Sequence, residues 1–199
     1  IYTCAKENME LRQCKREMYR RSFLKTLFIL GLSSFVPKLS FASIKTNYHG
    51  VRWLNLYHPK TKECLTAEYW VRGDYIQNAL SDVNYIMRDH HTGEVAHIDT
   101  KLLDLLFCIH TSLGASQPFH IMSGYRSPET NALLRKKGWD IAKHSLHENG
   151  KAIDIRLPNT KTSSLRRTAY KIKGGGVGYY PRLKFVHVDV GSIRYWTKY

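Results

Sequence analysis

Residues 144–154 read His144-Ser-Leu-His-Glu-Asn-Gly-Lys-Ala-Ile-Asp154, and this stretch places polar side chains where folding alone would favour apolar ones. Gly150 allows the chain to turn after His147, and the run that follows predicts a strand that points Asp154 back toward His147. A later strand carries His187-Val-Asp189, whose two polar side chains face the same way because they are two residues apart. The sequence therefore predicts that a turn and two strands meet at one polar site.

His147, Asp154 and His187 form a candidate zinc site. They would supply two imidazole nitrogens and one carboxylate oxygen, and a catalytic zinc site combines three protein ligands with one position open to water. The alternative is a hydrogen-bonded cluster of histidine and aspartate without a metal.

Spacing by itself is weak evidence, because the chain repeats the same intervals elsewhere. His97 and Asp104 repeat the interval between the first two candidate ligands, and His97 and Asp99 repeat the interval of the later strand. Asp99 is placed to cap a helix, so we expect His97 to be a surface residue that precedes that helix. The set around His147 differs because it combines a turn glycine, two flanking strands and a ligand from a separate strand.

Hydrophobic periodicity predicts helices and short strands in the rest of the chain. The first two strands are joined by Pro59-Lys-Thr-Lys62, which predicts a hairpin. Helices and strands do not alternate regularly enough for a doubly wound parallel sheet, so we expect an α+β domain with a small, mainly antiparallel sheet and flanking helices. The expected strands span 51–58, 63–70, 119–123, 152–156, 177–180 and 185–190, and the expected helices span 74–90, 99–113, 127–138 and 162–173.

The amino-terminal segment is predicted to be an export signal. Met18-Tyr-Arg-Arg-Ser-Phe-Leu-Lys25 is typical of a twin-arginine signal, and the apolar run from Thr26 to Val36 is too short for an ordinary membrane helix. Ser40-Phe-Ala42 offers small residues for cleavage after Ala42. The alternative is a basic cap on an amphipathic helix. We therefore expect an upstream extension over 1–17, a signal peptide over 18–42, and one domain over 43–199 in the periplasm.

Composition agrees with a globular domain, since 43% of the 199 residues are hydrophobic. Residues 1–42 hold 8 basic and 3 acidic residues, which leaves a charge of +10 for residues 43–199 and suggests an anionic partner. Nucleic acid is not expected as that partner, because no recognised binding motif is present and export would prevent the encounter. Cys64 and Cys108 remain in the domain, and two buried free thiols are favoured over a bridge between them.

The motifs taken together resemble a known family. Ser145-x-His-x-x-Gly-x-Ala-x-Asp154 followed by His187-x-Asp189 resembles the signature of the zinc D-Ala-D-Ala peptidases and their hedgehog-like relatives. Ser123-Gly-Tyr-Arg-Ser127 and Gly174-Gly-Gly-Val-Gly-Tyr-Tyr-Pro181 narrow the resemblance to the murein endopeptidase K type branch. The resemblance runs from about Val51 to Trp196 and implies the fold of that superfamily.

The resemblance implies a periplasmic zinc endopeptidase that cuts peptide cross-links in murein. By this resemblance His147, Asp154 and His187 hold one zinc ion, and Arg126 contacts the substrate. The alternative for Arg126 is a solvated arginine at the start of a helix. Tyr125 of the same turn is a further candidate for substrate binding. The bond cut would join D-Ala or meso-diaminopimelate to the meso-diaminopimelate of the next stem peptide, and no stable membrane span would remain after signal cleavage. The alternative is a non-catalytic, zinc-stabilised module that binds murein.

The catalytic base is less clearly indicated. Several relatives place the catalytic acid three residues before the last histidine, and that position here is Lys184, which cannot act as a carboxylate base. Asp189 is the remaining candidate to accept a proton from the attacking water, and its alternative role is to orient a ligand imidazole. His144 either donates a hydrogen bond to the intermediate or is a loop histidine. Tyr179 and Tyr180 either line the cleft or contribute to packing. Arg135–Lys137 and Arg166–Arg167 are expected to lie on solvated helix faces that also favour binding of an anionic polymer.

Overall fold

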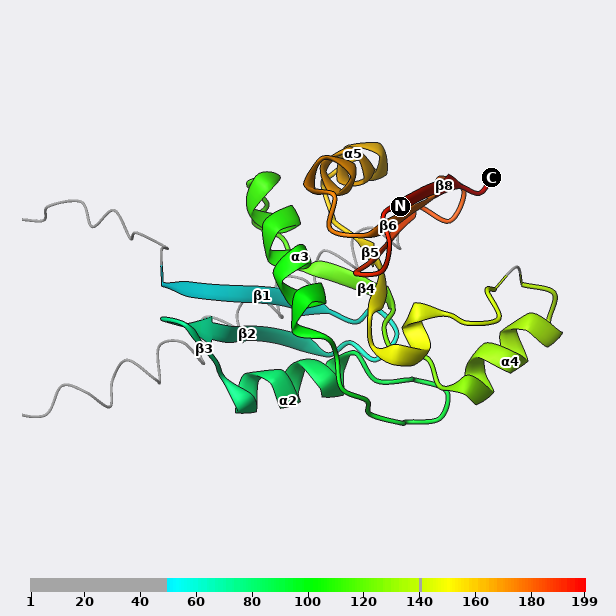
Figure 1. Cartoon of the computed structure of the whole chain (residues 1–199), viewed down its shortest axis with the longest axis horizontal. Coiled ribbons are helices and arrows are strands. Elements are labelled where there is room, and N and C mark those ends of the chain that lie inside the picture. The colour runs from blue at the N-terminus through cyan, green and yellow to red at the C-terminus, as the bar shows by residue number, and fades with distance from the viewer. Residues whose placement is uncertain (1–49, 140) are drawn as a thin grey trace, which may run out of the picture. The chain divides into compact units, whose positions relative to one another are not determined.

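The computed structural model describes residues 50–139 and 141–199, which are organised around one eight-stranded sheet (Figure 1). The predicted upstream extension (1–17), the predicted export signal (18–42) and residues 43–49 of the predicted domain lie outside the described residues. The strands are β1 (Val51–Tyr57), β2 (Cys64–Val71), β3 (Asp74–Tyr75), β4 (Phe119–Ser123), β5 (Ala152–Arg156), β6 (Gly176–Tyr180), β7 (Phe185–Asp189) and β8 (Arg194–Thr197). The helices are α2 (Gln77–Ile86), α3 (Thr100–Ser112), α4 (Pro128–Lys136) and α5 (Thr162–Ile172), with the short 3₁₀ helix η2 (Leu146–Asn149).

The strands follow one another across the sheet in the order β3-β2-β1-β4-β5-β7-β6-β8. Within the described residues, the pairs β1–β4 and β6–β8 are parallel and the other neighbouring pairs are antiparallel. A mixed α/β architecture with a mainly antiparallel sheet is therefore confirmed, but the expectation of a small sheet is wrong. Strand β3 has two residues and β8 is mostly exposed at an edge, so neither carries the buried alternation that reveals a strand in sequence.

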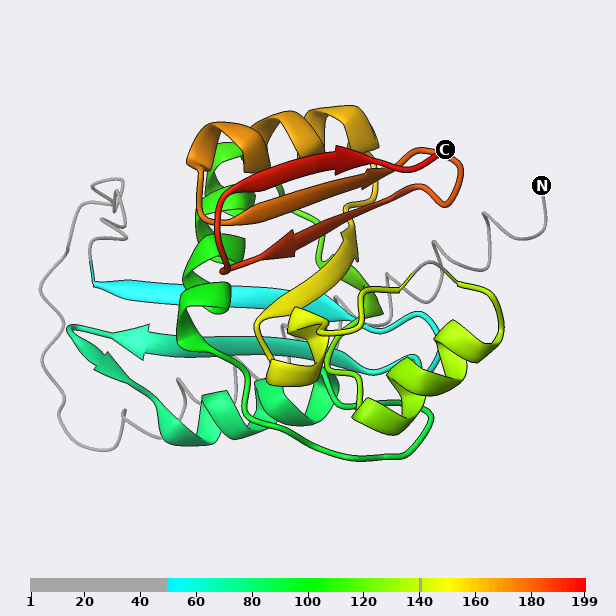
Figure 2. The same ribbon diagram turned by 45° about the vertical axis from the view of Figure 1, so that its right-hand side comes forward.

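The central strands turn apolar side chains toward one face of the sheet. Ile153 and Ile155 of β5 and Val186 and Val188 of β7 are each 0% exposed and belong to the main core. Helix α5 packs on β6 and β7, and α3 packs on α5 and β1, so both helices lie on the same side of these strands (Figure 2). Because side chains alternate along a strand, the intervening residues of β5 and β7 are presented to the opposite face.

Two of the four α-helices begin where the sequence places a cap. Asp99 and Ser127 each accept a backbone N–H in the first turn of α3 and α4, and Pro128 occupies the first position of α4. The helix expected over 74–90 is shorter than predicted. Its first residues form β3, which pairs with β2, because strand pairing satisfies their backbone groups before α2 begins at Gln77.

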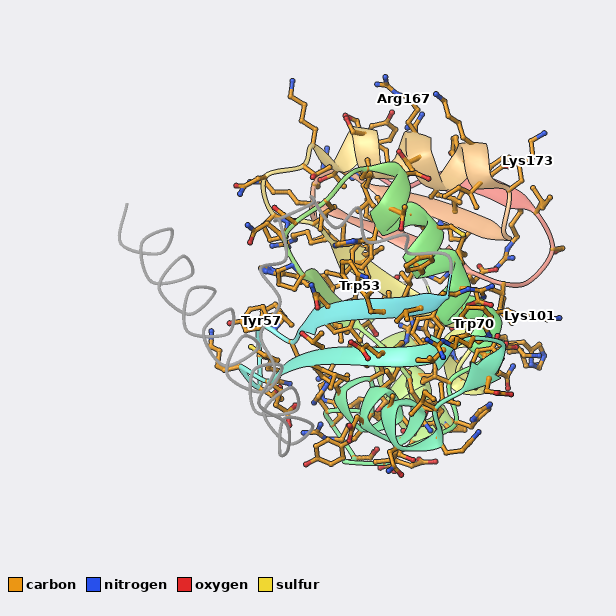
Figure 3. All side chains as sticks on the ribbon, turned by 90° about the vertical axis from the view of Figure 1, so that its left-hand side faces the viewer. Trp53, Tyr57, Trp70, Lys101, Arg167 and Lys173 are labelled. Carbon is orange, nitrogen blue, oxygen red and sulfur yellow. The ribbon has the colours of Figure 1, made fainter. Side chains whose placement is uncertain are left out.

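Helix α5 turns its basic residues in two directions. Arg167 is exposed and projects outward from the helix with Lys173, which follows it (Figure 3). The Arg166 guanidinium instead lies over the rings of Tyr170 and Tyr179, at 5.1 and 4.8 Å from their centroids. The prediction of a solvated face therefore holds for Arg167, whereas Arg166 contributes to packing.

The two cysteines of the predicted domain do not behave as expected. Cys108 is a free thiol exposed on α3, whereas Cys64 is partly buried and disulfide-bonded, and its bridge is not to Cys108. The expectation of two buried thiols is wrong because Cys108 falls on the outward side of α3, whose buried face is made by its leucines. Among the described residues, no helix is both long enough and apolar enough to cross a bilayer.

Gly150 ends η2 in the left-handed conformation with φ 63°, and a Cβ there would meet the backbone carbonyl of His97. Gly114 has a similar φ of 57° with no atom near the position of a Cβ. We expect Gly114→Ala to cost about 1 kcal/mol in the free energy of unfolding, because only the backbone conformation is strained. We expect Gly150→Ala to cost about 2–5 kcal/mol, because a backbone clash adds to that strain. Urea denaturation of both variants checks this, and equal losses would contradict it.

Candidate active site

The three candidate metal ligands meet on the face of the sheet opposite the main core. Strands β5 and β7 pair in antiparallel register so that Asp154 lies directly opposite His187, and η2 brings His147 to the same place. His147 Nε2 lies 3.1 Å from His187 Nδ1 and 3.4 Å from Asp154 Oδ1, and His187 Nδ1 lies 2.9 Å from Asp154 Oδ1. The exposed fractions are 0% for His147, 8% for His187 and 9% for Asp154. The structure therefore brings together the residues that the sequence singled out.

Each imidazole is oriented by a hydrogen bond on the side away from this cluster. His147 Nδ1 donates to the Gly124 carbonyl at 2.7 Å, and His187 Nε2 donates to Asp189 Oδ2 at 3.0 Å. Each neutral ring then has its proton on that nitrogen and turns the lone pair of its other nitrogen toward Asp154. When both rings are neutral, three acceptor atoms therefore converge, which is an arrangement that a cation stabilises.

The geometry of the three donors fits zinc. Bonds of about 2.0–2.2 Å in a tetrahedral site place neighbouring donor atoms about 3.3–3.6 Å apart. The three separations in the protein are 2.9, 3.1 and 3.4 Å, so shifts of about half an ångström or less would seat the ion. Two imidazoles and one carboxylate also match the ligand types of catalytic zinc sites.

The protonation states agree with a metal site. Burial would raise the pKa of Asp154, but His147 and His187 hold it well below its usual range, so the carboxylate is ionised. Burial lowers the pKa of His147, which keeps its imidazole neutral. Burial would also lower the pKa of His187, but hydrogen bonds to Asp154 and Asp189 instead raise it, so a metal ion would displace a proton from this ring when it binds.

Asp189 lies behind His187 rather than beside the converging donors. It is 0% exposed, and its oxygens accept from the backbone N–H groups of Gly176 and Gly191 and from both terminal nitrogens of Arg194, at 2.7–3.1 Å. Burial would raise the pKa of Asp189, but the hydrogen bonds from His187 and the two backbone groups lower it to about 2. Of the two roles weighed for Asp189, this environment favours orientation of the His187 ring.

The loop after β4 carries the predicted substrate contacts. The Arg126 backbone N–H donates to the His147 carbonyl at 3.2 Å, and its side chain reaches Ser145 Oγ at 3.4 Å. Its buried Nε has no hydrogen-bond partner among the described residues, and burial lowers the pKa of its guanidinium. Tyr125 is buried, and its hydroxyl donates to Glu94 at 2.8 Å. Arg126 is therefore free to contact a ligand, whereas the Tyr125 hydroxyl is already bonded.

Asp89 anchors this loop, and the sequence reasoning did not identify it. Its Oδ2 accepts from the backbone N–H and the hydroxyl of Ser127, each at 2.8 Å, and its Oδ1 accepts from the backbone N–H of His91 at the same distance. Burial opposes ionisation, but these and neighbouring donors lower the pKa of Asp89 to about 2. The one signal in the sequence was the polar run 88–91 directly after an amphipathic helix.

The metal cluster opens into a cleft of about 1050 Å³. His144 is exposed at its wall, and Tyr180 lines it while accepting a hydrogen bond from Trp196 at 3.1 Å. Tyr179, the preceding residue of β6, faces the opposite side of the sheet, and its ring packs beneath the Arg166 guanidinium. Lys184 is exposed in the turn between β6 and β7 and is not among the residues that line the cleft. The remaining lining includes Trp139, Leu183, Phe185, Arg156, Arg182 and Lys198.

The residues that imitate the site in sequence have structural roles. His97 is exposed, as predicted, and Asp99 caps α3. Asp104 accepts hydrogen bonds from the hydroxyls of Tyr69 and Tyr75 and pairs with Arg52. On α4, Lys136 and Lys137 are exposed, as expected for a solvated face, whereas Arg135 donates to the carbonyls of Ala142 and Lys143.

The low pKa of Asp89 predicts a pH dependence of stability. A carboxylate whose pKa falls on folding stabilises the protein above the unfolded pKa, and that contribution is lost as the pH falls through the folded value of about 2. We expect Asp89→Asn to reduce the free energy of unfolding at pH 7 by about 2 kcal/mol and to flatten its decline between about pH 4 and pH 2. Urea denaturation over this range checks the result. Asp82→Asn, an exposed position on α2, should keep the parental pH profile, and parallel profiles for parent and Asp89→Asn would contradict the prediction.

Comparison with known proteins agrees with the geometry. The Peptidase_M15_2 family model, described as Peptidoglycan L,D-endopeptidase MepK, matches residues 46–196. The Peptidoglycan L,D-endopeptidase MepK of Escherichia coli strain K12 and that of Shigella flexneri are each 37% identical over 182 residues, which cover 92% of this chain and 99% of either relative. The Probable peptidoglycan L,D-endopeptidase MepK of Haemophilus influenzae is 36% identical over 168 residues, which cover 84% of this chain and 89% of the relative. No solved structure matches the chain significantly.

The resemblance read from the motifs is thereby confirmed. The family model spans more than half of the chain, and relatives more than 30% identical align with nearly their whole length. The chain therefore belongs to the MepK family of M15 peptidases.

Proposed function

We propose that this protein is an exported zinc endopeptidase that hydrolyses peptide cross-links in peptidoglycan, with the α+β fold of the D-Ala-D-Ala peptidases. The observation that carries the proposal is the convergence of two imidazoles and one carboxylate, whose nearest donor atoms are 2.9–3.4 Å apart, at a cleft of about 1050 Å³. Membership of a family of peptidases supports the reaction class. The relatives' names supply the substrate class, since each is called a peptidoglycan endopeptidase.

His147, Asp154 and His187 would hold the metal ion. When bound, zinc acts as a Lewis acid that polarises the scissile carbonyl and lowers the pKa of water toward about 7. The protein contributes rigid placement of the donors, because Gly124 and Asp189 fix the two imidazole rings from behind. Arg126, half-buried with a buried and uncommitted Nε, would orient the substrate or stabilise negative charge on its carbonyl oxygen.

The charge of the cleft supports an anionic peptide as substrate. Asp89 and Asp154 are the carboxylates among the described lining residues; Ser127 and His91 hold the first, and the second is a candidate ligand. The basic lining residues are more numerous, and stem peptides carry free carboxylates that such a surface attracts. These basic residues are Lys60, Arg88, Arg126, Arg156, Arg182, Arg194 and Lys198.

The bond cut is proposed to be the one between two meso-diaminopimelate residues. The relatives are named L,D-endopeptidases, and this cross-link joins the carbonyl of an L-centre to the amine of a D-centre. The link from D-Ala to meso-diaminopimelate joins two D-centres instead. The name of the relatives thus favours the first cross-link over the second.

Two residues are proposed to support the reaction in different ways. Asp189 is completely buried with a pKa of about 2, so it is a weak base, and we assign it the positioning of His187. His144 is exposed on the cleft wall, where its imidazole is accessible for proton transfer with the substrate. Lys184 does not replace the acid of other relatives, because it lies in an exposed turn.

Export remains part of the proposal. Residues 18–42 are proposed to direct the chain through the twin-arginine route to the periplasm, with 1–17 upstream of the signal and 43–199 as the exported domain. The proposal is supported by the substrate of the relatives, because peptidoglycan lies outside the cytoplasm.

The metal assignment predicts the effect of removing a ligand. The purified protein should bind one zinc ion and cleave a cross-linked muropeptide dimer, and His147→Ala and His187→Ala should each lose both properties, because the site is left with two protein ligands. His97→Ala is the matched control, since it removes an exposed histidine with the same spacing to an aspartate. Metal analysis and product identification check the result. Full zinc occupancy in both ligand variants would refute the assignment, and binding of the dimer without cleavage by the parent would indicate a murein-binding module.

Asp189→Asn separates the positioning role from a role as base. If Asp189 orients His187, the variant should bind zinc roughly 10–100-fold more weakly and recover most of its activity at saturating zinc. A general base would instead contribute about 10²–10⁴-fold to turnover, and that loss would persist with the metal bound. We expect the first outcome. Zinc titration and cleavage rates at saturating zinc distinguish the two, and an unchanged zinc affinity with a persistent loss of turnover would contradict the positioning role.

A further inference from the structure

A second guanidinium lies close to the metal cluster on the same face of the sheet. Arg156 is the last residue of β5, two positions after Asp154, so both side chains face the cleft and their backbones are about 7 Å apart. One terminal nitrogen of Arg156 donates to the Leu183 carbonyl at 3.0 Å, which ties the side chain to the β6–β7 turn. Its Nε is buried and has no hydrogen-bond partner among the described residues.

Arg156 differs from Arg88 and Arg194 of the cleft because no carboxylate of the described residues is paired with it. Arg88 is held by both oxygens of Glu63 at 3.0 Å, and Arg194 is held by buried Asp189. The charges of these two side chains are therefore compensated within the protein. Arg126 and Arg156 remain as guanidiniums with a buried, uncommitted Nε.

The surroundings of Arg156 suit a carboxylate that arrives with an apolar chain. Leu183 and Phe185 line the cleft beside it, and the Phe185 ring stacks on Tyr180 with centroids 4.4 Å apart. Its partner across β4 and β5 is His120, whose pKa burial and Arg156 lower to about 4. That neighbour is neutral at pH 7, so it adds no positive charge beside Arg156.

The proposed substrate carries a carboxylate at a suitable position. In both candidate cross-links, the nitrogen of the scissile amide belongs to a meso-diaminopimelate carbon that also bears a free carboxylate. This carboxylate is two bonds from the reacting nitrogen, so it must lie within a few ångströms of the metal cluster when the bond is positioned for hydrolysis. Guanidinium groups bind carboxylates through two parallel hydrogen bonds.

We propose that Arg156 is a specificity-determining residue that binds the free carboxylate on the amine side of the scissile bond. This inference rests on the proposed function. A substrate that lacks this carboxylate leaves the buried donor of Arg156 unpaired, and an unpaired buried polar group penalises the wrong substrate strongly. Arg126 remains the contact implied by the family, and Arg156 adds a second contact from a different strand.

The test compares two cross-linked dimers, one with the free carboxylate and one in which the same group is a carboxamide. The parent should prefer the carboxylate dimer by roughly 10–100-fold in kcat/KM, mainly through KM. Arg156→Gln should lose this preference, and Arg156→Lys should keep only part of it because an ammonium cannot form the bidentate pair. Arg167→Gln removes the same charge from the outer side of α5 and should keep the parental preference (Figure 3).

Two results would overturn different parts of the reasoning. If Arg156→Gln is folded by thermal melting and still prefers the carboxylate dimer as strongly as the parent, the assignment of Arg156 is wrong. If the parent cleaves neither dimer, the proposed function is wrong, and equilibrium binding of the two dimers to the same variants then decides the role of Arg156. Loss of the binding preference in Arg156→Gln supports the carboxylate contact, and a preserved preference rejects it.

Discussion

The antiparallel register between β5 and β7 is the constraint on which the site depends. It places Asp154 opposite His187 and, on the other face, keeps Ile153, Ile155, Val186 and Val188 inside the core. A slip of one residue would exchange the two faces, bury the polar side chains among the helices and expose the apolar ones. The same hydrophobic alternation that stabilises the sheet therefore holds two of the three candidate metal ligands in contact.

The third ligand depends on a conformation that a side chain would prevent. His147 reaches the cluster from η2, which ends at Gly150 in a left-handed conformation against the carbonyl of His97. Its ring is then held from behind by the Gly124 carbonyl, and Asp89 secures the loop that contains this glycine by accepting from Ser127. The site is thus supported by backbone geometry and buried polar contacts on several elements, which a metal ion would further stabilise by binding only the folded state.

The charges of the cleft fall into two groups with different consequences. Asp189 and Arg194 compensate one another behind His187, and Glu63 compensates Arg88, so these pairs contribute to structure. Arg126 and Arg156 have no such partner among the described residues and face the space where a substrate would lie. The net charge of +15 in the sequence does not distinguish these groups, because only the folded chain shows which charges are already neutralised.

Much of the local structure and the residues of the candidate metal cluster could be predicted from the sequence. The caps at Asp99 and Ser127, the turn at Gly150 and the strand alternation of β5 and β7 are local signals, because each depends on residues adjacent in the chain. The environment of Asp189 could not be predicted from the residues next to it in the chain. Its position two residues after His187 shows only that both side chains share a face. Its burial among Gly176, Gly191 and Arg194 arises because β6 pairs with β7, β8 pairs with β6, and the loop after β7 folds back. Long-range contacts also decide what Asp89 and Arg156 bind and how wide the sheet is. Hydrogen-bond partners from distant segments are brought together only when the tertiary structure forms.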